Sequence, residues 1–318
     1  TPDEISQIAG GGFTGVGGAT LPVSGSLDAT EFFAELQVPI VTDKAFFKEL
    51  TVNGEYRYSD YGVSGNGVTN DFSTDSYGFS VTWAPIEDVR FRAQYQRAVR
   101  APNVIELFTG VNQGLANLNQ AGTNSNGVGL FDPCASSDPI ASQAACANTG
   151  VTADQFGNIL DVISGQTQVI TGGEPLLEPE VSDTYTVGVV ITPQAIPGLT
   201  ISVDYFDISL ENAIEAGIGA QVILDNCIAS GEDRFCNLLQ RSPTGSLASG
   251  GPGFGFISTN LNIAELTTSG IDFQVNYGVD FSGNSDIDFA LYGTYLTKST
   301  WQDTVDSDEY DYVGVAGV

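Results

Sequence analysis

Tyr77-Gly-Phe-Ser-Val-Thr-Trp-Ala-Pro-Ile-Glu-Asp-Val-Arg-Phe-Arg-Ala-Gln-Tyr-Gln96 is the stretch that decides the fold of this chain. Before Pro85, aromatic and aliphatic residues alternate with Gly, Ser and Thr, and after Asp88 they alternate with Arg and Gln. A period of two places the apolar residues on one face of an extended segment, which is typical of a half-buried β-strand. Proline and acidic residues at the break favour a turn. The stretch therefore predicts two neighbouring antiparallel strands.

The same alternation recurs along the chain and predicts eight strands, each with an apolar and a polar face. The predicted strands lie at about residues 30–40, 49–60, 73–84, 88–98, 182–192, 199–207, 266–278 and 286–298. Aromatic residues near the ends of the apolar segments are Tyr58, Tyr61, Tyr77, Tyr185, Tyr205, Phe206, Tyr277 and Tyr295.

The connections between these strands alternate in length. The short ones contain Pro or Gly and lie at Pro39–Lys48, Pro85–Asp88, Pro193–Gly198 and Gly278–Ser285. The long ones are Asp60–Phe72, Val99–Val181 and Asp207–Leu266. Short turns on one rim, long loops on the other and aromatic girdles at the strand ends are typical of an outer-membrane β-barrel. The predicted fold class is therefore all-β, a transmembrane antiparallel barrel with long extracellular loops.

Two other all-β folds also contain alternating strands. A soluble sandwich rarely places loops of more than about 50 residues all at one end, and it would bury Phe79 and Phe91 in a dry core. A β-helix would show a short fixed repeat, which the sequence lacks. Both are less consistent with the pattern than the barrel.

Composition excludes several classes of function. Ten Lys and Arg residues stand against 39 Asp and Glu, a formal charge of −29, which argues against binding to nucleic acid. There is no His, so His-based triads, metal sites and pH switches are absent. We find no nucleophile and base set, no metal-ligand spacing and no dinucleotide fingerprint. We therefore predict that the chain is not an enzyme, and the sequence implies no cofactor.

The four cysteines form two close pairs, Cys134 with Cys146 and Cys227 with Cys236. Four cysteines allow three connectivities. Pairing within each Gly- and Ser-rich stretch is the simplest, and it predicts two disulfides that staple the long loops in an oxidising compartment. Residues 218–229 also have the composition of a short helix that ends near Cys227.

Charged residues lie on the polar side of the predicted strands, where lipid is not expected. They are Glu35, Glu55, Arg57, Arg90 and Arg92. In a water-filled or plugged lumen such residues are solvated or paired without a special role. The more specific interpretation is that they contact a plug.

Four segments resemble the TonB-dependent outer-membrane receptors. They are Arg92–Phe108 with its Arg-Ala-Pro and Glu-Leu-Phe steps, Gly173–Tyr185 with its Leu-Leu-Glu-Pro-Glu run, Leu199–Ile214 and Thr268–Gln274. The second segment departs from the family pattern at Glu174, where Asn is usual, and at Glu178, where Lys is common. The segments occur in the family's order.

The resemblance implies a barrel of about 22 strands with a plugged lumen. It also implies that residues 1–318, which do not begin with Met, are a central fragment of one such barrel domain. On this basis several strands before Thr30, about five after Lys298 and the plug domain lie outside the chain.

The resemblance further implies TonB-dependent uptake of a scarce nutrient such as a siderophore, a vitamin or an oligosaccharide. The implied partners are outer-membrane lipid, a small-molecule or oligosaccharide ligand, and TonB with ExbB and ExbD acting through the plug. The alternatives are a passive porin, which would lack a plug, and a surface adhesin or assembling β protein that uses the loops to bind other proteins.

Overall fold

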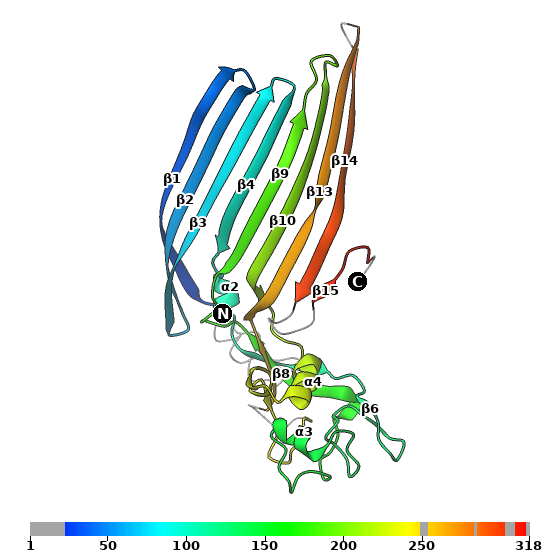
Figure 1. The fold of residues 1–318 in the computed structure, drawn as a ribbon. Helices are drawn as coiled ribbons and strands as arrows, with labels where there is room; N and C mark the ends of the chain where they lie inside the picture. Colours follow the sequence, from blue (N-terminus) through cyan, green and yellow to red (C-terminus); the bar gives the residue numbers. More distant parts are fainter. Residues whose placement is uncertain (1–22, 249–253, 283–284, 303–308, 316–318) are drawn as a thin grey trace.

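The computed structural model describes residues 23–248, 254–282, 285–302 and 309–315. Long antiparallel strands form one curved sheet, and a lobe of small elements extends from one end of it (Figure 1). The strands lie in the order β1-β2-β3-β4-β9-β10-β13-β14-β15. Their bounds are β1 Gly25–Lys44, β2 Phe47–Gly65, β3 Val68–Ile86, β4 Val89–Arg100, β9 Glu180–Ile191, β10 Leu199–Glu215, β13 Leu261–Ser282, β14 Ser285–Gln302 and β15 Tyr310–Asp311.

All eight predicted strands are present, and most are longer than the sequence pattern indicated. The prediction of a long connection at 60–72 is wrong. β2 and β3 continue through this segment and pair as far as Gly65 and Val68, so that only Asn66 and Gly67 form the turn. Both turn residues have positive φ, 49° and 81°, as a two-residue hairpin turn requires. The Asn-Gly pair tolerates this backbone, which explains the tight turn.

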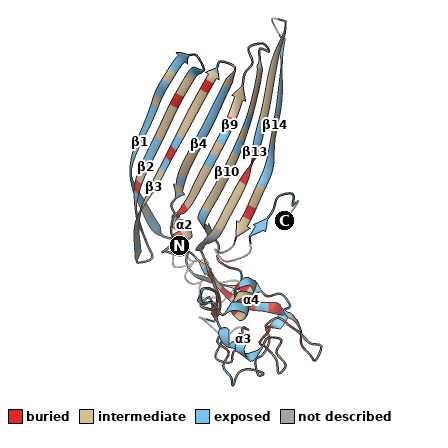
Figure 2. Cartoon of the chain, in the orientation of Figure 1, coloured by how far each residue is buried: buried red, intermediate tan, exposed pale blue. Residues whose placement is uncertain are grey.

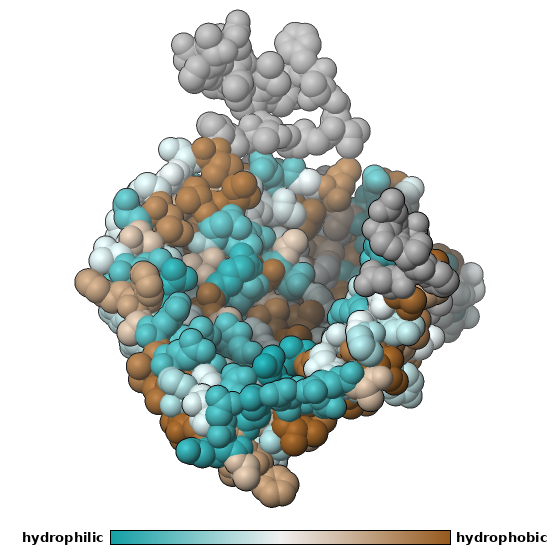
Figure 3. All heavy atoms as spheres, turned by 90° about the horizontal axis from the view of Figure 1, so that it is seen from above, coloured by the Kyte–Doolittle hydropathy of each residue, from teal (hydrophilic) through white to brown (hydrophobic). Residues whose placement is uncertain are grey.

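The strand register sorts the side chains into two faces. Phe79 and Phe91 lie on the apolar face and are 52% and 42% exposed. They do not occupy a dry core, so the structure contradicts the soluble sandwich. Seen from the end with the short turns, hydrophilic residues gather on the inner side of the curved sheet and hydrophobic residues on its outer side (Figure 3). This is the arrangement of a barrel wall with lipid outside.

The two longest connections fold together into the lobe. The β4–β9 connection provides α2 Val104–Phe108, β5 Asn112–Asn117, β6 Gly122–Thr123, β7 Gly129–Leu130, α3 Gln143–Asn148, a 3-10 turn at Ile163–Gly165 and β8 Gln166–Gly172. The β10–β13 connection provides α4 Ala220–Ser230, α5 Asp233–Cys236, β11 Leu239–Gln240 and β12 Gly255–Thr259. A four-stranded sheet in the order β11-β12-β8-β5 joins them, through parallel pairing of β12 with β8. The helix predicted at 218–229 is α4.

The lobe has its own hydrophobic core, whereas most strand residues of the large sheet are half-buried or exposed (Figure 2). Ile223, Leu224 and Phe256 of the β10–β13 connection are fully buried at its centre, and Leu118, Val162 and Val169 of the β4–β9 connection belong to the same buried cluster. A smaller cluster places Leu107 and Phe108 of α2 against Val63 of β2. These contacts hold the lobe to the end of the sheet. Within the residues that the structure describes, every helix is too short or too polar to cross a bilayer.

Candidate functional site

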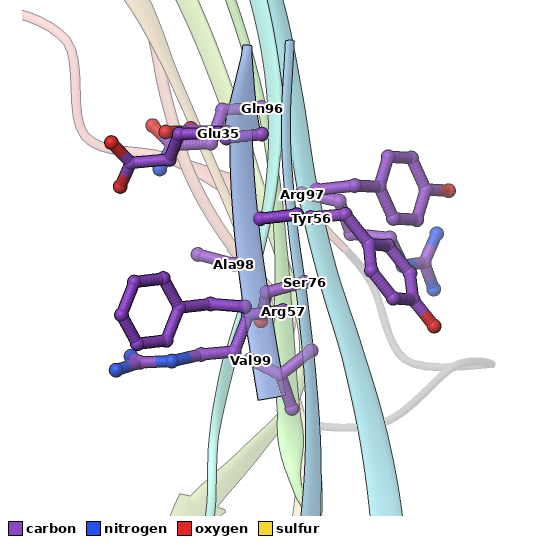
Figure 4. A pocket seen from close by; sticks show the side chains of 12 residues that line it. Glu35, Tyr56, Arg57, Ser76, Gln96, Arg97, Ala98 and Val99 are labelled. Atoms are coloured by element: carbon purple, nitrogen blue, oxygen red, sulfur yellow. The ribbon is translucent and has the colours of Figure 1, made fainter. Parts of the chain in front are cut away.

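The five charged residues singled out from the sequence share the inner, polar face of the sheet. In the strand register Glu35 of β1 lies directly opposite Glu55 of β2, and Gly78 of β3 and Gln96 of β4 continue this row. Figure 4 shows Glu35 and Arg57 on one side of the strands and Tyr56 and Arg97 on the other. We call this side, bearing Glu35, Glu55, Arg57, Arg90 and Arg92, the polar face.

Each arginine among the five forms an ion pair with a carboxylate of another strand of the sheet. The Arg57 to Glu31 distance is 3.3 Å and the Arg90 to Glu49 distance is 3.1 Å. Arg92 binds both carboxylate oxygens of Asp204 across β9, through Nε at 2.6 Å and Nη2 at 2.7 Å. Gly188 lies between these two residues, and a Cβ there would collide with the Asp204 carboxylate. The sheet therefore neutralises its own arginines.

Glu35 and Glu55 differ from these arginines because they have no hydrogen-bond or ion-pair partner within the described part of the chain. The two carboxylates belong to directly opposed residues of β1 and β2, where like charges destabilise a strand pair. Gly78 gives the Glu55 side chain room, since a Cβ at Gly78 would collide with the Glu55 carboxylate. The sequence predicted where these acids lie but not that they would be unpaired.

A second cluster lies where the lobe meets the sheet. Arg100 at the end of β4 binds Glu180, the first residue of β9, and also binds Glu106 of α2 at 3.0 Å. Glu106 completes a capping box with Asn103, whose side chain accepts from the amides of Ile105 and Glu106. The Arg-Ala-Pro and Pro-Glu steps noted in the sequence thus meet through one guanidinium. The resemblance of these two steps to receptor motifs was the only sequence signal for this contact.

Inside the lobe, a buried ion pair joins the two connections. Arg241 contacts Asp132 through Nη1 at 2.5 Å and Nη2 at 3.0 Å, and its Nε donates to the Thr149 hydroxyl at 2.8 Å. The side chains of Arg241 and Asp132 are 3% and 0% exposed. Sequence reasoning missed this pair because its members are 109 residues apart.

The predicted disulfides are confirmed. Cys134 pairs with Cys146, and Cys227 pairs with Cys236. The first closes the loop that leads into α3, and the second joins α4 to α5. Both pairs lie in the lobe, so the staples act on the connections and not on the large sheet.

The outer face carries aromatic residues toward the lobe end. The rings of Tyr77, Tyr95 and Tyr185 form a chain across β3, β4 and β9, with centroids 6.1 and 4.8 Å apart. The Tyr95 hydroxyl donates to Asp183 at 2.7 Å. Two of the aromatic residues predicted for the girdles, Tyr61 and Phe206, lie on the polar face instead. The register places Tyr61 opposite Phe72 and Phe206 opposite Thr186, on the side of the sheet that bears Arg57 and Arg92.

The opposite rim has a charge network of its own. Lys48 lies 2.7 Å from Asp43 and 2.8 Å from Glu87. The hydrogen bond from Lys48 holds the pKa of Glu87 below its usual range. Among the described residues, no group of three or more His, Cys, Asp or Glu side chains is arranged to hold a metal ion.

A family model described as "TonB dependent receptor-like, beta-barrel" matches residues 4–316. The chain belongs to this family. The predicted resemblance is thereby confirmed, and so is the fold class of an outer-membrane β-barrel. Its members are transport receptors and not enzymes. In such a barrel the apolar face contacts lipid and the polar face lines the lumen.

Solved receptor structures match most of the chain at low sequence identity. The siderophore receptor PirA from Pseudomonas aeruginosa is 12% identical, with a TM-score of 0.41, and the match covers 87% of this chain and 44% of PirA. A double mutant of the hemophore receptor HasR from Serratia marcescens, in complex with hemophore HasA and heme, is 17% identical, with a TM-score of 0.44 and coverage of 87% and 35%. A mutant of the ferric enterobactin receptor PfeA from Pseudomonas aeruginosa, in complex with enterobactin, is 13% identical, with a TM-score of 0.43 and coverage of 86% and 36%. The chain thus spans less than half of each receptor.

No curated protein sequence matches the chain.

Proposed function

We propose that this chain contributes part of the barrel wall and two extracellular loops to a receptor that imports a scarce nutrient across the bacterial outer membrane. The energy is delivered by TonB with ExbB and ExbD through a plug domain. The observation that carries the proposal is the match to the receptor barrel family over residues 4–316. The two longest connections emerge at the same end of that sheet, where receptor loops meet the ligand.

The lobe is the proposed ligand-contacting surface. Long structureless loops are usually functional or disordered, but this pair has a core, two disulfides and a buried ion pair. Such order keeps side chains in fixed positions, which lowers the entropy cost of binding a ligand. The ligand is a small molecule such as a siderophore, a vitamin or an oligosaccharide.

The polar face is the proposed contact surface for the plug. Glu35, Glu55, Arg57, Arg90 and Arg92 point from it toward the space that a plug fills in this family. Its hydrogen-bonding side chains suit a solvated polypeptide surface better than lipid. A plug that moves during transport would have to exchange polar contacts with this face.

An uptake experiment tests the proposal. The full-length receptor is expressed in its own bacterium with and without TonB, and cells are supplied with radiolabelled ferric siderophores, cobalamin and oligosaccharides. We expect saturable uptake of one class that is lost without TonB and in a variant whose lobe is excised between Asn112 and Gly172 and between Ala220 and Thr259. Uptake that persists without TonB would identify a passive porin. Binding of other proteins without any uptake would support an adhesin.

A further inference from the structure

The basic side chains of this chain are almost all neutralised within it. All ten Lys and Arg residues lie in the described part of the chain, and nine of them form ion pairs with carboxylates. The nine are Lys48, Arg57, Arg90, Arg92, Arg97, Arg100, Arg234, Arg241 and Lys298. The exception, Lys44, ends β1 at the short-turn rim, away from the lobe.

On the polar face the pairing leaves only negative charge uncompensated. The four arginines there pair with four carboxylates of the same sheet, through Arg57–Glu31, Arg90–Glu49, Arg92–Asp204 and Arg100–Glu180. Among the residues whose side chains the structure describes, the register places five further acids on this face, none of them in an ion pair. They are Glu35, Glu55, Asp272, Asp286 and Asp288.

The lobe shows the same imbalance. Arg241 is buried against Asp132, and Arg234 lies 2.7 Å from Glu232. The lobe contains no other basic residue. Its exposed carboxylates include those of Asp154, Glu178, Asp225 and Asp233. A molecule approaching from the lobe side therefore meets carboxylates without an ion-pair partner in the described part of the chain, whereas both arginines of the lobe already face a carboxylate.

The ligand's charge then decides whether it can follow this path. An anion would lose hydration without gaining a cationic partner, unless it displaced a carboxylate from an existing ion pair. A cation would gain uncompensated carboxylates both in the lobe and on the polar face. Fields of one sign in a cleft alter the local ligand concentration and association rate by a factor of roughly 10 to 1,000.

We propose that this part of the receptor selects ligands by charge. It admits molecules that carry an ammonium or guanidinium group and disfavours molecules that are anionic. The inference rests on the proposed function, because it assumes that a ligand passes the lobe and the polar face. It concerns the class of ligand, which the family assignment leaves open.

The charge preference is measurable without knowing the ligand. In the full-length receptor, a cysteine is introduced by Gln96→Cys on the polar face or by Gln113→Cys on the exposed side of β5. The four native cysteines of this chain are held in disulfides and do not compete. The thiolate attacks the thiosulfonate sulfur of a methanethiosulfonate reagent, forming a mixed disulfide and releasing methanesulfinate. Rates are compared for trimethylammonium, neutral and sulfonate reagents of similar size, each relative to the same reagent with a free thiol.

We expect the cationic reagent to react on the order of tenfold faster than the anionic one at both positions, with the neutral reagent between them. The double variant Glu35→Gln, Glu55→Gln should lower the ratio at position 96 and leave that at position 113 unchanged. Glu49→Gln should also lower it, because this substitution frees Arg90. Ser80→Ala, an uncharged change on the same face, is the matched control and should have no effect.

Equal rates, or a faster anionic reagent, at the exposed position 113 would overturn the inference, and that position remains reactive even if a plug shields position 96. If the double glutamate variant does not fold, Glu49→Gln still tests the sign of the effect. The outcome of the uptake experiment does not depend on these labelling rates. A high rate ratio without TonB-dependent uptake would refute the proposed function only, and uptake without a charge preference would refute this inference only.

Discussion

At the scale of single residues, buried charge sets the strongest constraints. Arg241 and Asp132 come from different connections and meet in a site closed to solvent. A buried ion pair contributes little net stability relative to an apolar replacement, but removal of one partner leaves a desolvated charge. This pair therefore enforces the correct association of the two connections more than it adds to the total stability.

The first prediction concerns Asp132→Asn. This variant leaves the Arg241 guanidinium buried without a counter-charge and should destabilise the lobe by about 3–5 kcal/mol. Limited proteolysis of the full-length receptor should then cut the lobe at least tenfold faster. The double variant Asp132→Leu, Arg241→Met, which removes both charges, should recover much of the loss. If the double variant is as sensitive as the single one, lost packing and not unpaired charge is the cause.

The second prediction concerns Arg100→Gln at the junction. The substitution removes the guanidinium that joins Glu180 to Glu106. Because Arg100 is about half exposed and solvent screens its ion pairs, we expect a loss below the range for buried charged hydrogen bonds, about 1 kcal/mol. Hydrogen exchange of the α2 amides should accelerate about fivefold. Lys48→Gln, which breaks exposed pairs at the other rim, should leave α2 exchange unchanged, and an equal effect there would argue against a local role for Arg100.

At the scale of elements, backbone conformation determines where strands end. β2 and β3 reach 19 residues each because a two-residue turn connects them. Gly67 has φ of 81°, a conformation that costs a residue with a Cβ about 1–2 kcal/mol. Gly54 lies in the middle of β2 without positive φ, and a Cβ added there would meet no neighbouring heavy atom within 4 Å. The turn conformation therefore favours glycine at position 67, whereas neither backbone conformation nor lack of space requires glycine at position 54.

The third prediction compares these glycines. Gly67→Val should lower the free energy of unfolding by about 2 kcal/mol, since a branched side chain is strained in the left-handed region. Gly54→Ala should have the opposite sign and stabilise by about 0.5 kcal/mol, because Ala loses less backbone entropy in a strand. Guanidinium unfolding of the full-length receptor in detergent gives both values. A stabilising Gly67→Val would contradict the assigned turn.

At the scale of the whole molecule, the sheet and the lobe are stabilised differently. The sheet relies on backbone pairing and on lipid around its apolar face, where large residues such as Phe32, Leu36 and Phe289 are more than half exposed to solvent in the isolated chain. The lobe relies on a dry core and two disulfides. Reduction should therefore affect only one of the two parts.

The fourth prediction concerns the disulfides. Replacing both Cys227 and Cys236 by Ser should destabilise the lobe by about 3 kcal/mol, as expected for a short closed loop. Protease sensitivity of the lobe should rise, while the β-sheet circular dichroism signal on heating stays as in the native receptor. Loss of sheet signal at the same temperature would show that the lobe and the sheet unfold as one unit.

The periodic part of this structure was accessible from sequence, because a half-buried strand repeats its pattern every two residues. Alternation located all eight main strands and placed Glu35, Glu55, Arg57, Arg90 and Arg92 on one face. Proximity in the chain was enough to pair the cysteines. The same pattern underestimated β2 and β3, since many residues on either side of the Asn66-Gly67 turn, among them Gly62, Ser64, Thr69 and Asn70, are small or polar and alternate only weakly with apolar ones.

Sequence by itself therefore determined the local repeat, the short disulfides and, through its motifs, the family. Only the tertiary structure decided which distant groups meet: the association of the two connections in one lobe, the Arg241–Asp132 pair, and the neutralisation of nearly every cation by a carboxylate on another element. The physical reason is range. Strand alternation and nearby cysteines are set by neighbours along the chain, whereas an ion pair between residues 109 positions apart depends on the register and curvature of everything between them.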